Sequence, residues 1–365
     1  MNFKKVFLTV MFIAIAGTAV MAQETTATPY AGVRYFIGAY AQDKNMPGGK
    51  DIDLANTLVN TSRLGVNFSK GNLSGKAEIG LGPGHAGVVA TRHIYAQYAA
   101  DSGLTVLVGQ TDLPWYMPLS NEAFDIHGGP GTSQADRTPQ IKISYQGFYL
   151  IAAKYYGTTP PNQNFGYYPA LYDDKDLYMP LTGIGYDLKS EMLDLGVGFA
   201  GYKQADKTAG AQDVVAYIGY VHGTAKLGDM FIRFNAAYEK APMLLGLTQG
   251  QPMFRGSNGT PTGHLLHSVL ADTEKATDHF VEGMLEFGYK LPMGVFTASI
   301  GYQKNITTDL DGSADRMGIG AQMAINVYPG FAVVPTIFYL DELQDKDGNA
   351  QGADLLAGIQ FRADF

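Results

Sequence analysis

The sequence predicts an all-β fold, namely a transmembrane antiparallel β-barrel of about sixteen strands. The first observation behind this prediction is an alternation of apolar and polar residues with a period of two, which returns along the whole chain. The second is the composition, which contains 45 Gly and 23 Tyr but only 16% charged residues, fewer than a soluble domain of this size usually has. Glycine and aromatic residues are typical of barrel walls and of their interfaces with the membrane surface.

The clearest alternating segment is the end of the chain, from Asp354 to Phe365. Its apolar residues share one parity and are Leu355, Ala357, Ile359, Phe361, Ala363 and Phe365. A strand of about ten residues with one apolar face is long enough to cross a bilayer in a barrel wall. The same segment would also suit the edge of a soluble sandwich, so the rest of the chain has to decide between the two.

Residues 1–22 are predicted to be a secretory signal peptide. Lys4 and Lys5 precede an apolar run from Val6 to Val20, and residues tolerated at a cleavage site follow it. A membrane-anchoring helix is disfavoured because the run is short for a span and polar residues come directly after it. Residues 23–365 are then expected to form one outer-membrane barrel domain.

Composition excludes several other classes of protein. The chain contains no Cys, which excludes a lipid-anchored lipoprotein, a disulfide scaffold, thiol catalysis and thiolate metal sites. Removing Lys4 and Lys5 from the 26 basic side chains leaves 24 against 34 acidic ones, a net charge of −10. Nucleic acid is therefore not an expected partner. Beyond the signal peptide, no segment approaches the run of about twenty apolar residues that a membrane helix needs.

The alternating segments predict the individual strands, which are joined by connections that are short and long in turn. Strands are expected at residues 30–42, 64–68, 73–81, 92–100, 104–111, 141–145, 148–156, 181–188, 193–202, 214–222, 230–239, 280–289, 295–303, 316–326, 331–340 and 354–365. An even number of strands places both termini on the periplasmic side, with long loops outside, and a barrel this large encloses water. Pro335 counts against the bounds of one strand, because proline is tolerated only at edges or bulges.

The sequence also contains residues that could form a metal site or a catalytic site. His264, His267 and His279 could bind a metal, but no acidic residue lies at ligand spacing, so solvated loop histidines are the better interpretation. Glu282 and Glu286 are too far apart along one strand for a catalytic dyad, and they are expected to line the lumen. No Ser nucleophile motif accompanies a matching His, which disfavours an outer-membrane lipase or protease. No catalytic residue, metal or cofactor is predicted.

The order of motifs resembles that of Gram-negative general porins. A strand at residues 62–66 (Ser-Arg-Leu-Gly-Val) is followed by a tight turn and a strand at residues 75–81 (Gly-Lys-Ala-Glu-Ile-Gly-Leu). Residues 108–110 (Val-Gly-Gln) then precede a long third loop. The resemblance covers the whole mature chain in layout, but in sequence pattern only residues 61–112 and the C-terminal strand.

The resemblance implies a homotrimer of sixteen-stranded barrels, with the third loop folded into each lumen as a constriction. It also implies that acids on this loop face a basic cluster on the opposite wall. The candidate pore-lining residues are Arg34, Arg63, Lys76, Glu78, Arg92 and Arg362 on the wall and Glu122 and Asp125 on the loop. The loop, with Ser-Asn-Glu-Ala-Phe-Asp at residues 120–125, departs from the enterobacterial type. Phe365 is expected to be the signal that the barrel-assembly machinery recognises.

The expected function is a water-filled channel in the outer membrane of a Gram-negative cell. Small hydrophilic solutes and ions would diffuse through it passively, and outer-membrane lipid would surround it. Inward charges on the strands nearly balance, so acids of the third loop such as Glu122 and Asp125 would give a weak preference for cations. The alternatives are a substrate-selective porin for saccharides or anions and a non-conducting structural or adhesive barrel.

Overall fold

The structure is a computed structural model. It describes residues 25–42, 52–59, 61–81, 90–116, 137–153, 177–178, 180–205, 214–240, 279–306, 313–345 and 352–365. The predicted signal peptide and the predicted long loop at residues 240–278 lie outside these ranges, apart from Lys240. Both therefore stay predictions.

The described residues form a single sheet of eighteen antiparallel strands. The strands are β1 (Thr26–Gln42), β2 (Asp53–Leu58), β3 (Arg63–Lys70), β4 (Leu73–Gly80), β5 (Ala90–Ala99), β6 (Leu104–Thr111), β7 (Thr138–Tyr145), β8 (Phe148–Ala153), β9 (Leu177–Tyr178), β10 (Leu181–Lys189), β11 (Leu193–Ala205), β12 (Val214–Leu227), β13 (Met230–Lys240), β14 (His279–Leu291), β15 (Gly294–Asn305), β16 (Ser313–Tyr328), β17 (Phe331–Asp345) and β18 (Ala353–Asp364).

These eighteen strands fill sixteen positions around a closed barrel, as the sequence predicts. Two positions are each filled by two successive strands: β2 and β3 both pair with β1, and β9 and β10 both pair with β11. Each of the sixteen predicted strands has its counterpart in the sheet. The strand expected at residues 148–156 is described only as far as Ala153, and Lys154 lies outside the described residues.

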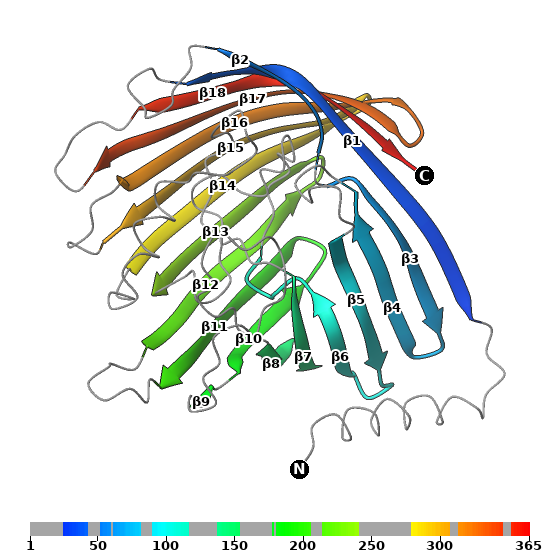
Figure 1. Ribbon diagram of the computed structural model, residues 1–365. Helices are drawn as coiled ribbons and strands as arrows, with labels where there is room; N and C mark the ends of the chain where they lie inside the picture. The colour runs from blue at the N-terminus through cyan, green and yellow to red at the C-terminus, as the bar shows by residue number, and fades with distance from the viewer. Residues whose placement is uncertain are drawn as a thin grey trace.

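The barrel closes where the first strand meets the last. β1 pairs with β18 from Gly32 opposite Asp364 to Gln42 opposite Asp354. The final residue extends this seam, because the Phe365 amide donates to the Ala31 carbonyl at 2.9 Å and its carbonyl accepts from the Ala31 amide at 3.2 Å. Figure 1 shows the long β1 lying beside β18 along one part of its length and beside β3 along another. Closure pairs the first strand with the last, so neither of them forms an open edge of the sheet along this seam.

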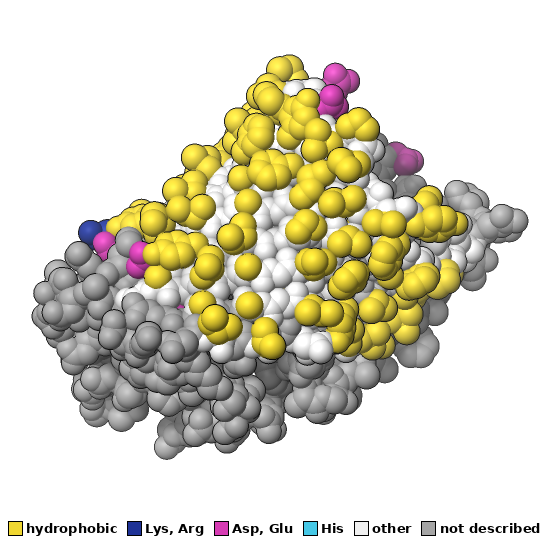
Figure 2. All heavy atoms as spheres, turned by 90° about the horizontal axis from the view of Figure 1, so that it is seen from above, with side chains coloured by type: hydrophobic (Ala, Val, Ile, Leu, Met, Phe, Trp, Pro, Cys, Tyr) yellow, Lys and Arg dark blue, Asp and Glu magenta, His cyan; other side chains and the backbone are white. Residues whose placement is uncertain are grey.

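Side chains alternate between an apolar outer face and a more polar inner face. On β14 the outward Val281, Leu285 and Phe287 are 43%, 55% and 40% exposed. The inward Glu282 and Glu286 between them are 3% and 1% exposed. Figure 2 shows apolar side chains spread across the outer wall, with acidic and basic ones near its margins. Such a surface matches the hydrocarbon of a bilayer, where a Lys or Arg at mid-depth costs about 2–4 kcal/mol.

The strand expected at residues 331–340 is confirmed as part of β17, which continues through Pro335 although a proline counts against these bounds. Pro335 pairs with Ile359 of β18 on one side. On the other side the register with β16 passes from Gln322 opposite Thr336 to Ile325 opposite Val333. β17 therefore accommodates the missing proline N–H locally. Its pairing with β16 is interrupted between these two pairs and resumes in the same register.

Changing Phe365 tests the role of the closing seam in assembly. Deletion of Phe365 removes both of its backbone hydrogen bonds to Ala31 and the aromatic side chain, whereas Phe365→Ala removes only the side chain. Because Phe365 is 80% exposed and shares the parity of the outward Leu355 and Ile359, we expect both variants to yield less heat-modifiable barrel in outer membranes. Phe365→Tyr should retain the yield of the wild type. Normal yield combined with altered conductance in Phe365→Ala would contradict a role in assembly.

Candidate functional site

A charged cluster on the inner wall is the candidate functional site, and Glu78 of β4 is its centre. One carboxylate oxygen, Oε1, accepts from Arg92 Nε at 2.7 Å. The other, Oε2, accepts from the Tyr30 hydroxyl at 2.6 Å and lies 3.0 Å from Lys76 Nζ. Arg63 Nε lies 3.8 Å from the same oxygen. We call Arg63, Lys76 and Arg92 the basic cluster; it joins three strands of the wall through one carboxylate.

The exposure of these groups determines which charges can act on a solute. The Glu78 side chain is fully buried, and that of Arg92 is 7% exposed. Arg63 and Lys76 keep 32% and 24% of their side-chain surface exposed. One carboxylate neutralises only one of the three bases, so the cluster carries a net positive charge toward water. Arg63 and Lys76 are the groups that present it.

A β-bulge brings Arg92 into the cluster. Glu78 pairs with His93, and the register between β4 and β5 shifts directly after this pair, so that Arg92 is an extra residue on β5. Arg92 and His93 are 6% and 8% exposed and both contact Glu78, although neighbours on a regular strand face opposite sides. Simple alternation from the outward Ile94 would have pointed Arg92 toward lipid. Its place in the cluster therefore depends on the bulge.

Arg34 takes part in a separate ion pair at the closing seam. Its Nη2 lies 2.7 Å from Asp364 Oδ1, and its Nη1 donates to the Ala363 carbonyl at 3.4 Å. Arg34 stands opposite Arg362 in the register of β1 and β18. The Arg362 Nε donates to the Gln360 side-chain oxygen. The Arg34 side chain is only 6% exposed, so its charge acts mainly on its partners at the seam and little on the water inside the barrel.

The cluster continues to the two ends of the predicted third loop. Arg137 Nε lies 3.2 Å from Asp112 Oδ1 and also donates to His93 Nε2 at 3.2 Å. The remaining ring nitrogen of His93, Nδ1, lies 3.0 Å from the Thr111 hydroxyl oxygen. Asp112 directly follows β6 and Arg137 directly precedes β7, so this contact joins the first and last residues of the loop. Sequence reasoning missed His93 and Arg137, because only the pairing of β4 with β5 brings His93 to Glu78, and only the fold brings Arg137 to His93.

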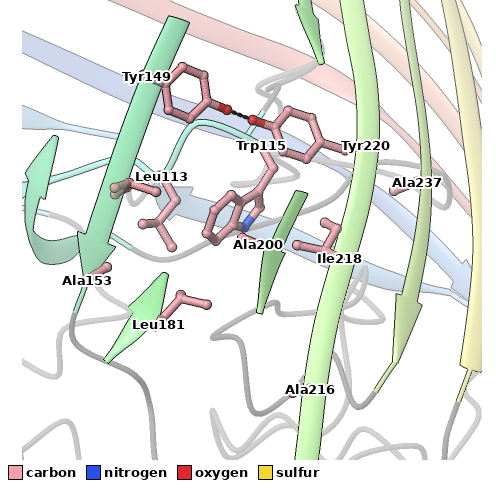
Figure 3. Packing of buried hydrophobic residues seen from close by; sticks show 11 residues of the cluster. Leu113, Trp115, Tyr149, Ala153, Leu181, Ala200, Ala216, Ile218, Tyr220 and Ala237 are labelled. Atoms are coloured by element: carbon pink, nitrogen blue, oxygen red, sulfur yellow. Dashed lines mark hydrogen bonds between the residues drawn. The ribbon is translucent and has the colours of Figure 1, made fainter. Parts of the chain in front are cut away.

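The first residues of the loop rest on an apolar part of the inner wall. Leu113 and Trp115 are 2% and 1% exposed. They belong to a buried cluster whose wall residues we call the inner shelf: Tyr149, Ile151, Ala153, Leu181, Ala200, Ala216, Ile218, Tyr220 and Ala237. Figure 3 shows the Trp115 indole between Leu113 and Ile218, below Tyr220. A strand such as β8, apolar on both faces, is the signal in the sequence that could have indicated this covered wall.

Glu122 and Asp125 lie outside the described residues, as does the rest of the predicted loop from residue 117 to 136. Their place in a constriction therefore stays a prediction. On β14 the structure shows two further inward acids. Arg233 Nη1 of β13 lies 2.9 Å from Glu286, and the Gln303 side-chain amide of β15 donates to Glu282 at 3.5 Å. These two carboxylates are held by wall partners and are not a catalytic pair.

No group of His, Asp or Glu side chains suited to a metal ion is present among the described residues. His279 is hydrogen-bonded to Tyr238 on the outer face, whereas His264 and His267 lie outside the described ranges. In the part of the chain that the structure describes, no helix is sufficiently long and apolar to span a membrane.

Known structures show which fold this arrangement represents. The outer membrane channel DcaP of Acinetobacter baumannii is similar with a TM-score of 0.65 and 16% identity, over 93% of this chain and 97% of that one. An anion-selective porin from Comamonas acidovorans is similar with a TM-score of 0.60 and 13% identity, over 94% and 100%. The chain has the porin fold. OmpT of Vibrio cholerae, in a trimer form, is similar with a TM-score of 0.53 and 16% identity, over 93% and 99%.

The porin fold confirms, at the level of structure, the resemblance seen in the sequence. The apolar outer face of this barrel agrees with the expected place in the outer membrane of a Gram-negative cell. The similar structures are named as channels, porins or outer membrane proteins, in agreement with a barrel that is not an enzyme. No protein-family model matches the chain, and no curated protein matches it in sequence.

Cysteine labelling tests which way the basic cluster points. Because the chain has no Cys, Arg63→Cys and Lys76→Cys each introduce a single thiol without background. Both should react with a charged, water-soluble maleimide applied to intact membranes. The neighbouring Leu64→Cys and Ala77→Cys are matched controls that should stay unreactive in lipid. Labelling at 64 and 77 in place of 63 and 76 would mean that the register is slipped by one residue.

Glu78→Gln tests how much the central carboxylate stabilises this wall. Breaking a fully buried ion pair costs roughly 3–5 kcal/mol, but Arg63 and Lys76 keep contact with water, so we expect a loss of about 2 kcal/mol. The measurement is the urea midpoint of barrel unfolding, followed by heat-modifiable migration in gels. Glu191→Gln, at an exposed turn between β10 and β11, is the control. Equal midpoints for the two variants would show that the carboxylate contributes no stability.

Proposed function

We propose that the protein is a water-filled outer-membrane channel through which small hydrophilic solutes and ions diffuse passively. The observation that carries this proposal is a closed barrel of sixteen positions with an apolar outside and charged groups inside. Barrels of 16–18 strands typically enclose an aqueous lumen, whereas about eight strands are filled by their own side chains. A wide charged interior supports a pore over a non-conducting structural or adhesive barrel.

We further propose that the channel is a homotrimer inserted by the barrel-assembly machinery. A trimer form is named for one similar structure, the Vibrio cholerae OmpT. For recognition by the assembly machinery, the support within this chain is the terminal strand, whose outward parity ends in the exposed Phe365. Chemical cross-linking in native outer membranes would test the oligomeric state.

The ion preference is the finer part of the proposal. A weak preference for cations depends on Glu122 and Asp125 lying at the narrowest point, where a low-dielectric wall would concentrate their field. A preference for anions is the second candidate. It is supported by the net positive charge that Arg63 and Lys76 present to water, and an anion-selective porin is among the structures with this fold.

Reversal potentials decide between these two preferences. The potential is measured across a KCl gradient in planar bilayers for the wild type, for Glu122→Gln with Asp125→Asn, and for Arg63→Gln with Lys76→Gln. If the loop acids dominate, the wild type should prefer cations, and the reversal potential of Glu122→Gln with Asp125→Asn should shift toward anion preference. If the basic cluster dominates, the wild type should prefer anions, and the reversal potential of Arg63→Gln with Lys76→Gln should shift toward cation preference. Screening acts over about 10 Å at 0.1 M salt, so either preference should fade as salt rises.

Liposome swelling tests the channel itself. Proteoliposomes are placed in sugars of graded size, and a pore should give swelling rates that fall steadily with solute size. A substrate-selective porin would instead favour one sugar over others of equal size. Absence of swelling with every sugar, from barrels shown to be folded by heat-modifiability, would contradict the channel and support a structural barrel.

A further inference from the structure

Part of the inner wall is built to stay dry. The inward residues of the inner shelf are apolar, and Ile151, Leu181 and Ile218 are at most 3% exposed. Inward positions that meet water in a barrel are usually polar, because buried apolar surface is favourable only when something covers it. Leu113 and Trp115 contribute to that cover. The shelf spans β8, β10, β11, β12 and β13, all neighbours in the wall.

The shelf holds the Trp115 ring next to Tyr220. Its centroid lies 6.1 Å from that of Tyr220 on β12. The Tyr220 hydroxyl is hydrogen-bonded to that of Tyr149 on β8, so the two side chains bridge the inner faces of β10 and β11 (Figure 3). The Trp115 N–H has no hydrogen-bond acceptor among the described residues. The indole is therefore held by its apolar surface.

Glycines on β10 and β11 make room for this bridge. A Cβ added at Gly198 would lie 2.6 Å from the Tyr220 hydroxyl oxygen and 2.8 Å from that of Tyr149. A Cβ at Gly185 would overlap the Tyr149 hydroxyl. Real Cβ atoms do not come this close, so only glycine lets the two tyrosines lie against the wall. The alternating glycines of these strands thus have a specific packing role.

The backbone of the same segment is fixed beside the ring. His222 Nε2 lies 3.0 Å from the Pro114 carbonyl oxygen, to which it donates. The imidazole stacks on Tyr220 with centroids 5.6 Å apart and ring planes at 12°. A Cβ at Gly196 would lie 2.6 Å from His222 Nε2, so a glycine again provides the space. Side chain and backbone contacts therefore place residues 113–115 on one side of the barrel.

We infer that Trp115 and its seat on the inner shelf divide the lumen into a dry side and a wet side. The seat consists of Tyr149, Gly185, Gly198, Tyr220 and His222. Tyr220 and His222 on β12, which contact Trp115 and Pro114, stand six to eight positions from β5, β4 and β3 around the sixteen-position wall, so this end of the seat lies across the barrel from the basic cluster. Permeating solutes are thereby confined to the side where Arg63 and Lys76 reach water. Trp115 is a positioning residue for solute selectivity, an inference that rests on the proposed channel function.

Removing the ring should widen the path and weaken the influence of the basic cluster. Trp115→Ala is expected to raise single-channel conductance about twofold and to move the reversal potential toward zero, because ions can pass farther from Arg63 and Lys76 than the screening length of about 10 Å. Trp115→Phe should keep the conductance and selectivity of the wild type, because the indole N–H makes no bond that phenylalanine would lose. A merely structural role would lower barrel yield without changing selectivity.

Fluorescence tests the seat independently of conduction. Trp115 is the single Trp of the chain, so the emission of the intact protein reports on this site alone. We expect weak quenching by acrylamide in the wild type and several-fold stronger quenching in Gly198→Ala, where the tyrosines must move. Gly219→Ala is the matched control on β12: its added Cβ would meet only Phe199 at 3.9 Å, and quenching should not change.

The outcomes separate the two levels of the proposal. Unchanged conductance and reversal potential in Trp115→Ala, together with unchanged quenching in Gly198→Ala, would overturn the inference while leaving the channel intact. A wild type that forms no conducting pore would overturn the proposed function, and the quenching comparison would still decide whether Trp115 is seated on the shelf. Strong quenching in the wild type would overturn the seat directly.

Discussion

The structure depends on one constraint: inside a bilayer no backbone N–H or C=O group can be left without a partner. The seam between β1 and β18 meets this constraint, and it joins residues from opposite ends of the chain, such as Arg34 and Ala363, which are 329 positions apart. The last residue, Phe365, completes it with two backbone hydrogen bonds to Ala31. Alternation of side chains then assigns one face to lipid and the other to the lumen all around the wall.

Closure is also what allows charge to be buried in a membrane protein. The Glu78 side chain has no exposed surface, and its charge is tolerated because Tyr30 and Arg92 donate to it and Lys76 Nζ lies 3.0 Å from Oε2. These partners come from three different strands, so the carboxylate fixes their relative positions as much as it neutralises charge. The bulge on β5 supplies one more contact than a regular strand would, by turning Arg92 and His93 to the same side.

The two sides of the lumen follow different physical rules. Near β3, β4 and β5 the wall is charged, and polar groups satisfy one another or meet water. The inner shelf on β8 to β13 is apolar, and glycines of β10 and β11 lie beneath its tyrosines, so this part of the wall is stable only when covered. The segment after β6 contacts both sides, because Asp112 pairs with Arg137 beside His93 while Trp115 lies on the inner shelf. A short stretch of chain thus connects the charged wall to the dry one.

The sequence by itself determined the closed barrel, the positions of its strands and the parity that separates Leu64 from Arg63, because contact with lipid acts on each strand locally and leaves a period of two. It could not determine contacts that depend on register between distant strands. Tyr30 reaches Glu78 across 48 positions and His222 reaches Pro114 across 108. The bulge at Arg92 likewise depends on the pairing of β4 with β5 and not on local pattern. Only the tertiary structure decided these features, because pairing in a sheet brings together residues that are far apart in the sequence. The local sequence pattern does not indicate which of these distant residues will contact one another.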